Sequence, residues 1–326
     1  MNPRARMGLK MALGAVLLAL PLVVEDRYFM HLLITSGIFV LLASSWNLLT
    51  GFAGLLNLGH AAFYGIGAYT SAILATKLGL NPWLGLLMGG LVAGLFGLML
   101  GVPSLRLSGP YLAITTIGFS EILRLVAMNW VELTRGSLGL YGIPPLPGFS
   151  LGDWLVVDFR HEMWSYYLIL ALVGISLWAI RRLTISQFGL TIKSLREDDV
   201  AAGSIGVDIA AYKLAVFTIS AFFAGVAGAF FAHYQRLVSP DTLSLGETFA
   251  ILTMVMVGGL GTLPGPVLGA ILLTFLSEWL RFLEDFVKLD VRMVIYGLLL
   301  VLTILFMRGG MVGLWQRLRA AYARKG

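Results

Sequence analysis

Long apolar segments follow one another along almost the whole chain, with only short polar or glycine-rich stretches between them. A helix needs about 20 apolar residues to cross the hydrocarbon core of a bilayer. We identify ten candidate spans: Met11–Val24, Phe29–Leu49, Phe52–Thr76, Pro82–Val102, Gly109–Trp130, Met163–Ile180, Tyr212–Tyr234, Glu247–Gly261, Pro264–Leu280 and Val291–Met307. The two segments from Glu247 to Leu280 are short and separated by glycine and proline, which predicts half-helices or steeply tilted helices. The predicted fold is an all-α polytopic membrane protein, with one transmembrane domain over residues 1–326.

The composition agrees with lipid as the main solvent of the chain. Apolar residues make up 58% and charged residues 12% of the sequence, whereas soluble domains carry about 25% charged residues. A soluble fold could not bury this much apolar surface. The net charge of +6 comes without a basic stripe interleaved with aromatics, which argues against nucleic-acid binding. The absence of cysteine from the sequence excludes disulfides and thiolate metal sites, and the four scattered histidines lack metal-ligand spacing.

The first apolar segment, Met11–Val24, is short for a membrane span. It follows Arg4, Arg6 and Lys10 and so resembles the core of a signal peptide. No small-x-small cleavage site follows it, and we therefore favour a retained first span.

The distribution of basic residues predicts the orientation. An even number of spans places both termini on one side of the membrane, and most of the 23 basic residues then fall on the side of the termini. Because basic residues favour the cytoplasm, we expect both termini there. The same orientation places the loop 131–162 outside and the charged loop 181–212 inside.

Glycine-interrupted apolar segments occur in both halves of the chain. The first contains Thr50–His60 and the second Gly258–Ala270. Such segments indicate a substrate pathway in transporters built from repeats, so two five-helix repeats and no repeat are equally open interpretations. The candidate pathway or helix-break residues are Asn47, Gly51, Gly54, Asn57, Gly59, His60, Gly258, Gly259, Gly261 and Pro264. We favour close helix packing as the role of the glycines, while structural and pathway roles are equally open for Asn57 and His60.

The charged loop contains the pattern of a short polar helix. Ser194 and Glu197 form Ser-x-x-Glu, a capping box that predicts a helix start at Ser194. Acidic residues then lie in the first turn, where the helix dipole favours them, and Gly203 or Gly206 ends the helix. Asp208 is placed to cap the next helix. The product is either a solvated connector or a docking helix for a cytoplasmic partner. Its candidate coupling residues are Ser194, Arg196, Glu197, Asp198, Ala201, Ala202, Gly203 and Gly206.

Two pairs of opposite charges lie three residues apart within apolar segments. For Glu121 and Arg124 we predict a buried ion pair that holds helices together, with a proton relay as the alternative. Glu278 and Arg281 lie near the outer end of their segment, so we expect a wetted pair there.

Three separated motifs resemble the LivH/LivM family of ABC-importer permeases. They are Thr50–Tyr69, Ser194–Gly206 and Gly258–Pro266, and their order and spacing resemble the LivM-type subunit in particular. The resemblance runs from about Phe29 to Met307 and does not extend to the first span or to the sequence of 136–162.

The resemblance implies a specific assembly and location. Arg196–Gly206 would match the coupling helix that the ATPase contacts, and the cargo would be branched-chain amino acids, with relatives that handle urea or short amides. The implied partners are two cytoplasmic ATPase subunits, a second homologous permease in a heterodimer, and an extracellular or periplasmic substrate-binding protein. The implied location is the inner membrane of a prokaryote.

The sequence also bears on competing functions. It has no P-loop motif, so we expect ATP and magnesium on partner subunits and no cofactor on this chain. An ion-coupled secondary transporter is the main alternative, but it needs ionisable residues at membrane depth, and only Glu121, Arg124 and His60 qualify. An intramembrane enzyme ranks last because no catalytic motif joins the serines and aspartates. Because a soluble receptor would supply specificity, we expect no strongly charged pocket within this chain.

Overall fold

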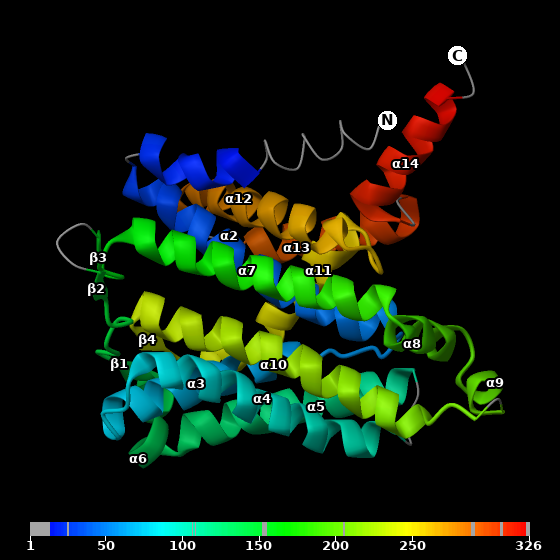
Figure 1. The fold of residues 1–326 in the computed structure, drawn as a ribbon, viewed down its shortest axis with the longest axis horizontal. Coiled ribbons are helices and arrows are strands. Elements are labelled where there is room, and N and C mark those ends of the chain that lie inside the picture. Colours follow the sequence, from blue (N-terminus) through cyan, green and yellow to red (C-terminus); the bar gives the residue numbers. More distant parts are fainter. Residues whose placement is uncertain are drawn as a thin grey trace.

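In a computed structural model, helices form one bundle with short strands at one end and two short polar helices at the other (Figure 1). The structure describes residues 14–24, 26–105, 107, 109–151, 155–204, 206–287, 291–306 and 309–323. The helices of the first half are Gly14–Val23, α2 (Arg27–Trp46), η1 (Asn47–Phe52), α3 (His60–Lys77), α4 (Pro82–Ser104), α5 (Pro110–Asn129), α6 (Val131–Thr134), η2 (Gly136–Leu138) and α7 (Glu162–Ile185). Those of the second half are α8 (Gln187–Glu197), α9 (Asp199–Ser204), α10 (Ile209–Gln235), η3 (Pro240–Leu243), α11 (Leu245–Gly258), α12 (Pro264–Val287), α13 (Val291–Phe306) and α14 (Gly310–Ala323).

The helical, membrane-type architecture agrees with the prediction in its coarse form. Among the described residues, five helices are long and apolar enough to cross a membrane: Arg27–Phe52, Pro82–Pro103, Pro110–Asn129, Glu162–Ile185 and Ile209–Gln235. Shorter apolar helices cover Gly14–Val23, Leu245–Gly258 and Val294–Thr303. The count of ten spans and the five-helix repeat stay predictions, as does a full span at Met11–Val24, of which residues 11–13 lie outside the described part.

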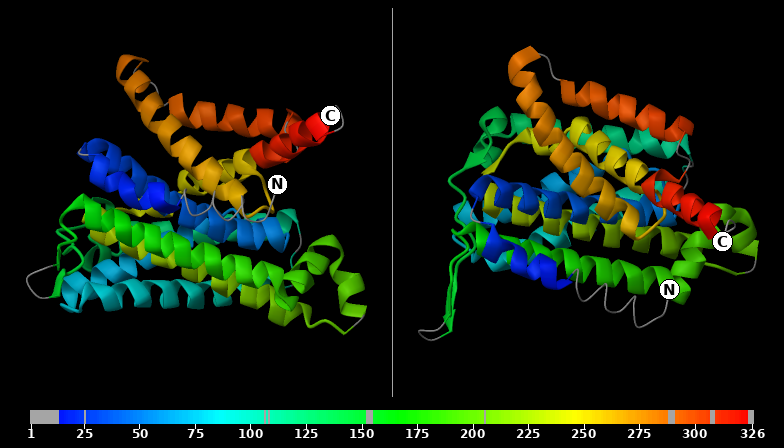
Figure 2. Two further views of the ribbon diagram at one scale, coloured as in Figure 1. Left: turned by 45° about the horizontal axis from the view of Figure 1, so that its top comes forward. Right: turned by 90° about the horizontal axis from the view of Figure 1, so that it is seen from above.

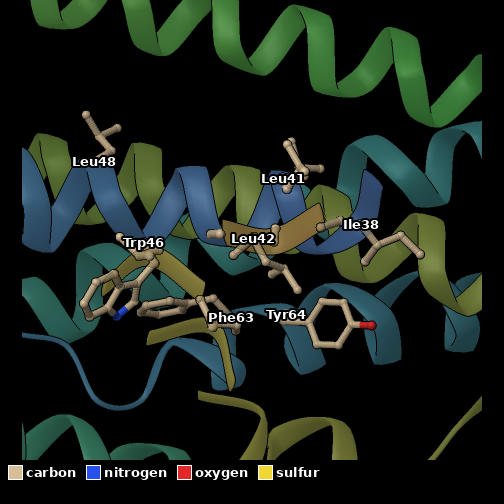
Figure 3. Packing of buried hydrophobic residues seen from close by; sticks show 14 of the residues in the cluster. Ile38, Leu41, Leu42, Trp46, Leu48, Phe63 and Tyr64 are labelled. Atoms are coloured by element: carbon tan, nitrogen blue, oxygen red, sulfur yellow. The ribbon is translucent and has the colours of Figure 1, made fainter. Parts of the chain in front are cut away.

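The centre of the bundle is α2, which is buried on nearly every side. Ile38, Leu42 and Trp46 are at most 2% exposed, and they pack near Phe63 and Tyr64 of α3 (Figure 3). A helix that is hydrophobic all round belongs in the interior of a larger structure. The helix therefore forms a core element, with α7, α10 and α12 against it.

Helices α3, α4 and α10 form the tightest layer, where glycines allow backbones to approach closely. A Cβ at Gly228 of α10 would lie 1.9 Å from the carbonyl oxygen of Tyr64, and one at Gly67 would lie 2.1 Å from that of Gly225. Small residues at such crossings increase van der Waals contact between helices in a membrane. The other side of the bundle holds α11, α12 and α13 (Figure 2).

Two predicted spans differ from the structure. Phe52–Thr76 is not one helix, because α2 continues into the π-helix η1, an irregular stretch follows, and α3 begins only at His60. Pro264–Leu280 is not a half-helix but part of α12, which has 24 residues. A proline in the first turn starts a helix rather than ending it. The short segment is α11, with 14 residues.

The predicted outer loop, residues 131–162, contains regular structure. It includes α6, η2 and three short strands, β1 (Leu140–Tyr141), β2 (Phe149–Leu151) and β3 (Leu155–Val157). Strand β1 pairs with β4 (Leu237–Val238), which follows α10, and β2 pairs with β3. The first pairing ties the loop to the end of α10 at the strand end of the bundle (Figure 1).

Candidate functional site

The charged segment folds as two short helices at the end of the bundle opposite the strands (Figure 1). The predicted capping box at Ser194 is wrong, because Ser194 lies in the last turn of α8 and its Oγ donates to the Thr191 carbonyl oxygen at 2.8 Å. Glu197 is the last residue of α8. The reason is packing: Ile192 and Leu195 are buried, so the amphipathic face extends the helix through the local start signal.

The break falls instead at Asp198, which has an extended backbone. Its Oδ1 accepts from the Ala201 amide at 2.9 Å and so caps the start of α9, as a helix-capping aspartate does. Of the two predicted terminators, Gly206 has the left-handed φ of +87°, and its amide donates to the Gly203 carbonyl oxygen at 3.0 Å. The predicted cap of α10 is confirmed, since Asp208 Oδ1 accepts from the Ala211 amide at 3.0 Å.

Helix α9 is held to the bundle by an ion pair. Lys213 Nζ of α10 lies 2.9 Å from Asp199 Oδ2, and the lysine side chain is only 11% exposed. Ala202 is buried, whereas Ala201 and Gly206 are exposed. The α8–α9 segment is therefore attached to the end of the helical bundle.

Arg196 reaches from α8 to the π-helix η1, although much of its side chain stays exposed. Its Nη1 donates to the carbonyl oxygen of Gly51 in the π-helix η1. A Cβ at Gly54 would lie 2.8 Å from Arg196 Cγ, and one at Gly261 would lie 3.0 Å from Nη1. The glycines thus leave the space that the arginine side chain occupies. The sequence singled out Arg196 as a docking residue but did not predict its contact with η1.

Asn47 joins the two glycine-interrupted segments, which are far apart in sequence. Its Nδ2 donates to the Thr262 carbonyl oxygen and its Oδ1 accepts from the Gly261 amide, both at 2.8 Å. The side chain is 2% exposed. We call the cluster of Asn47, Gly51, Arg196, Gly261 and Thr262 the glycine joint. It connects η1, the turn between α11 and α12, and α8.

Asn57 and His60 belong to a buried hydrogen-bond network. Ser45 Oγ donates to the Leu42 carbonyl oxygen and lies 2.9 Å from His60 Nε2. Asn57 Nδ2 lies 3.3 Å from His60 Nδ1, and its Oδ1 accepts from the Gly59 amide at 2.9 Å. Both residues are fully buried, and each polar side-chain atom has a partner. The network favours the structural interpretation over a pathway role.

The predicted packing role of the glycines agrees with the geometry. A Cβ at Gly59 would lie 2.0 Å from the Thr116 carbonyl oxygen of α5, and one at Gly258 would lie 1.9 Å from that of Gly265. Gly259 and Gly261 also have positive φ values of +133° and +72°, which only glycine adopts readily. Pro264 then begins α12.

The two ion pairs form, but the first is not buried within this chain. Arg124 Nη2 lies 2.6 Å from Glu121 Oε1, and the side chains are 26% and 37% exposed. Because both lie on α5, the pair does not link helices of this chain. Arg281 Nη1 lies 3.6 Å from Glu278 Oε1, with the arginine side chain 67% exposed, so the predicted wetted pair is confirmed.

Charged residues of both signs line one cavity, and two of them pair with each other, so the expectation of no strongly charged pocket stays a prediction. A cavity of about 440 Å³ lies between α2, α11, α12 and α13, and its wall includes Glu247, Glu278 and Arg281. The sequence could not place Glu247 in the same cavity wall as the other two, because only helix packing brings the three to one cavity. In the part of the chain that the structure describes, no group of histidine and acidic residues could hold a metal ion.

Comparisons with known proteins agree with the sequence resemblance. The high-affinity branched-chain amino acid transport system permease protein LivM of Salmonella typhimurium is 36% identical over 93% of this chain and 74% of its own length. LivM of Escherichia coli is 38% identical over 84% of this chain and 68% of its own length. LivH of Escherichia coli is 26% identical over 84% of this chain and 91% of its own length. No solved structure matches the chain. A family profile described as the permease component of branched-chain amino acid transport systems matches residues 28–304, and the chain therefore belongs to this permease family.

Proposed function

We propose that this chain is a permease subunit of an ATP-driven importer of branched-chain amino acids. The names of the LivM and LivH relatives support both the permease role and the cargo. A more distant relative, 26% identical over 63% of this chain, is a nucleoside ABC transporter permease of Lactococcus lactis. The name of this relative supports transport driven by ATP hydrolysis. It also makes nucleosides the alternative cargo that should be tested beside amino acids.

The observation that carries the mechanism is the contact of Arg196 with Gly51. Force on α8 from a soluble partner would act directly on the π-helix η1 and, through Asn47, on the turn between α11 and α12. π-Helical turns are frequent at functional sites. Packed helices shift as discrete units. Motion at α8–α9 would therefore be transmitted directly to η1 and the helices that pack against it.

The proposed assembly contains two copies of this fold. We place a second homologous permease beside this chain, two ATPase subunits that bind ATP and magnesium against α8–α9, and a substrate-binding protein at the strand end. The membrane is the inner membrane of a prokaryote, with both termini in the cytoplasm. The excess of basic residues on the side of the termini supports this orientation.

The experiment is uptake by the reconstituted assembly. The chain is co-reconstituted with its genomic neighbours in liposomes, and uptake of labelled leucine, a nucleoside and a short amide is measured with internal ATP. Leucine uptake that needs ATP and persists without ion gradients supports the proposal. Uptake without ATP that collapses with the proton or sodium gradient would establish the ion-coupled alternative instead, and uptake of the nucleoside or amide alone would overturn the proposed cargo.

A further inference from the structure

The cavity between α2, α11, α12 and α13 has the size and lining of a small-molecule site. Its volume of about 440 Å³ lies within the range of about 300–1,000 Å³ that is typical of ligand pockets. One part of the wall is apolar and consists of Leu32, Phe39, Ala250 and Met254. The remainder carries hydroxyl, carboxylate and guanidinium groups. This division suits a ligand with one apolar part and one polar part.

The first turn of α11 contributes both backbone and a carboxylate to the cavity wall, through Gly246 and Glu247. The helix has 14 residues, which corresponds to about 21 Å, and it is thus shorter than the hydrocarbon core of about 30 Å. Gly246 of this first turn lies in the cavity wall, where it has no side chain to cover the backbone. Ser244 Oγ already accepts from the Glu247 amide at 3.4 Å, and Glu247 makes this end of the helix acidic. Short helices in transporters present their ends to substrates.

An unpartnered hydroxyl in the same wall is the second observation. Thr274 of α12 is 5% exposed, and among the described residues its Oγ1 has no hydrogen-bond partner. A buried hydroxyl without a partner costs about 1–3 kcal/mol, so it is retained where another molecule satisfies it. Thr274 lines the cavity, and a bound ligand would provide that partner.

Charges of both signs complete the wall. Glu278 accepts from the Tyr28 hydroxyl at 2.8 Å and faces Arg281 at 3.6 Å. A carboxylate has about four acceptor sites, so Glu278 retains capacity for a further donor such as an ammonium group. The largely exposed Arg281 can meet an anion entering from solvent.

We propose that this cavity is a transit site for a zwitterionic amino acid with an aliphatic side chain. The carboxylate lies near Thr274 and Arg281, the ammonium group faces Glu247 and Glu278, and the side chain covers the apolar wall. The inference rests on the proposed function, because it takes the cargo to be an amino acid. The site binds weakly, since a transit site must release what it receives.

The test uses the absence of cysteine from the sequence. A single thiol is introduced by Ser277→Cys in the cavity wall of the chain in its full assembly. Its alkylation by a water-soluble maleimide is timed by mass spectrometry of this subunit, with and without L-leucine. Leu138→Cys, at an exposed residue of the outer loop, is the control. Leucine is expected to slow labelling at 277 about fivefold or more and to leave labelling at 138 unchanged.

Ligand analogues and matched variants sharpen the result. Leucinol lacks the carboxylate and 4-methylpentanoate lacks the ammonium group, so neither should protect the thiol. Thr274→Val and Glu278→Gln should each raise the leucine concentration for half-protection about tenfold. Thr253→Val is the control, because Thr253 is a buried α11 residue whose hydroxyl already donates to the Phe249 carbonyl oxygen. Equal protection by all three compounds, or none by leucine, would overturn the proposal.

Uptake measured in parallel separates this proposal from the function. If the assembly transports leucine with ATP while leucine leaves the thiol at 277 unprotected, the transit site is wrong and the function stands. If leucine protects the thiol but no leucine is transported, the proposed function is wrong and the binding site stands.

Discussion

Removing the Arg196 side chain should separate ATP hydrolysis from uptake. The guanidinium makes a part-buried hydrogen bond to the Gly51 carbonyl oxygen, and a hydrogen bond of a charged group contributes about 1.5–3 kcal/mol. At 1.4 kcal/mol per tenfold change in an equilibrium constant, Arg196→Ala should weaken the link between α8 and η1 by roughly 10- to 150-fold. We expect ATPase activity to remain while leucine uptake per ATP falls by about tenfold or more.

The assay compares uptake with phosphate release in the same proteoliposomes. Arg182→Ala is the control, since it removes an exposed arginine at the end of α7 that does not contact the glycine joint. Arg196→Lys keeps the charge on a side chain without the planar fork and should give an intermediate ratio. The reasoning is refuted if Arg196→Ala transports as much leucine per ATP as the unmodified assembly.

Three further predictions concern packing and proton transfer. Asn47→Ala removes both hydrogen bonds that close the glycine joint and leaves part-buried backbone groups of Gly261 and Thr262 without this partner, at up to about 1–3 kcal/mol each. The apparent melting temperature of the purified chain should fall by several degrees, and an unchanged melting temperature would contradict the role. Gly228→Ala places a Cβ within contact of a backbone oxygen and should reduce the folded yield in detergent, whereas Gly174→Ala, with nothing within 4 Å of the added atom, should not. Equal yields of the two variants would show that the crossing of α3 and α10 is looser than described. Glu121→Gln should leave ATP-driven uptake nearly unchanged, because in the described chain the carboxylate pairs only with Arg124 of its own helix. Loss of uptake with normal expression would instead support the proton-relay interpretation.

The apolar segments were predictable because both the lipid and the protein core require apolar side chains along the whole length of a helix. Their boundaries and polar contacts were less so. Ser194 and Glu197 carry a valid local start signal, but the burial of Ile192 and Leu195 extends α8 through it. Local capping contributes about 1 kcal/mol, which an apolar helix face against the bundle outweighs.

No local sequence pattern predicted the long-range contacts in the candidate site. Asn47 meets Gly261 across 214 positions of sequence, and no spacing rule connects them. The glycines themselves were identified correctly as points of close approach. Their partners, including Arg196, depend on how α8 docks on the bundle, which periodicity does not specify.

The π-helical turn at Asn47–Phe52 accommodates one residue more than an α-helical turn would. If its hydrogen bonds changed from i→i+5 to i→i+4, everything after it would rotate by about 100° and advance by about 1.5 Å. Such a change of register would turn Gly51 away from Arg196. It would also shift residues 53–59, which precede α3, by one side-chain position. The segment that Arg196 contacts therefore has a geometry from which a change of hydrogen-bond register would move the chain by one residue.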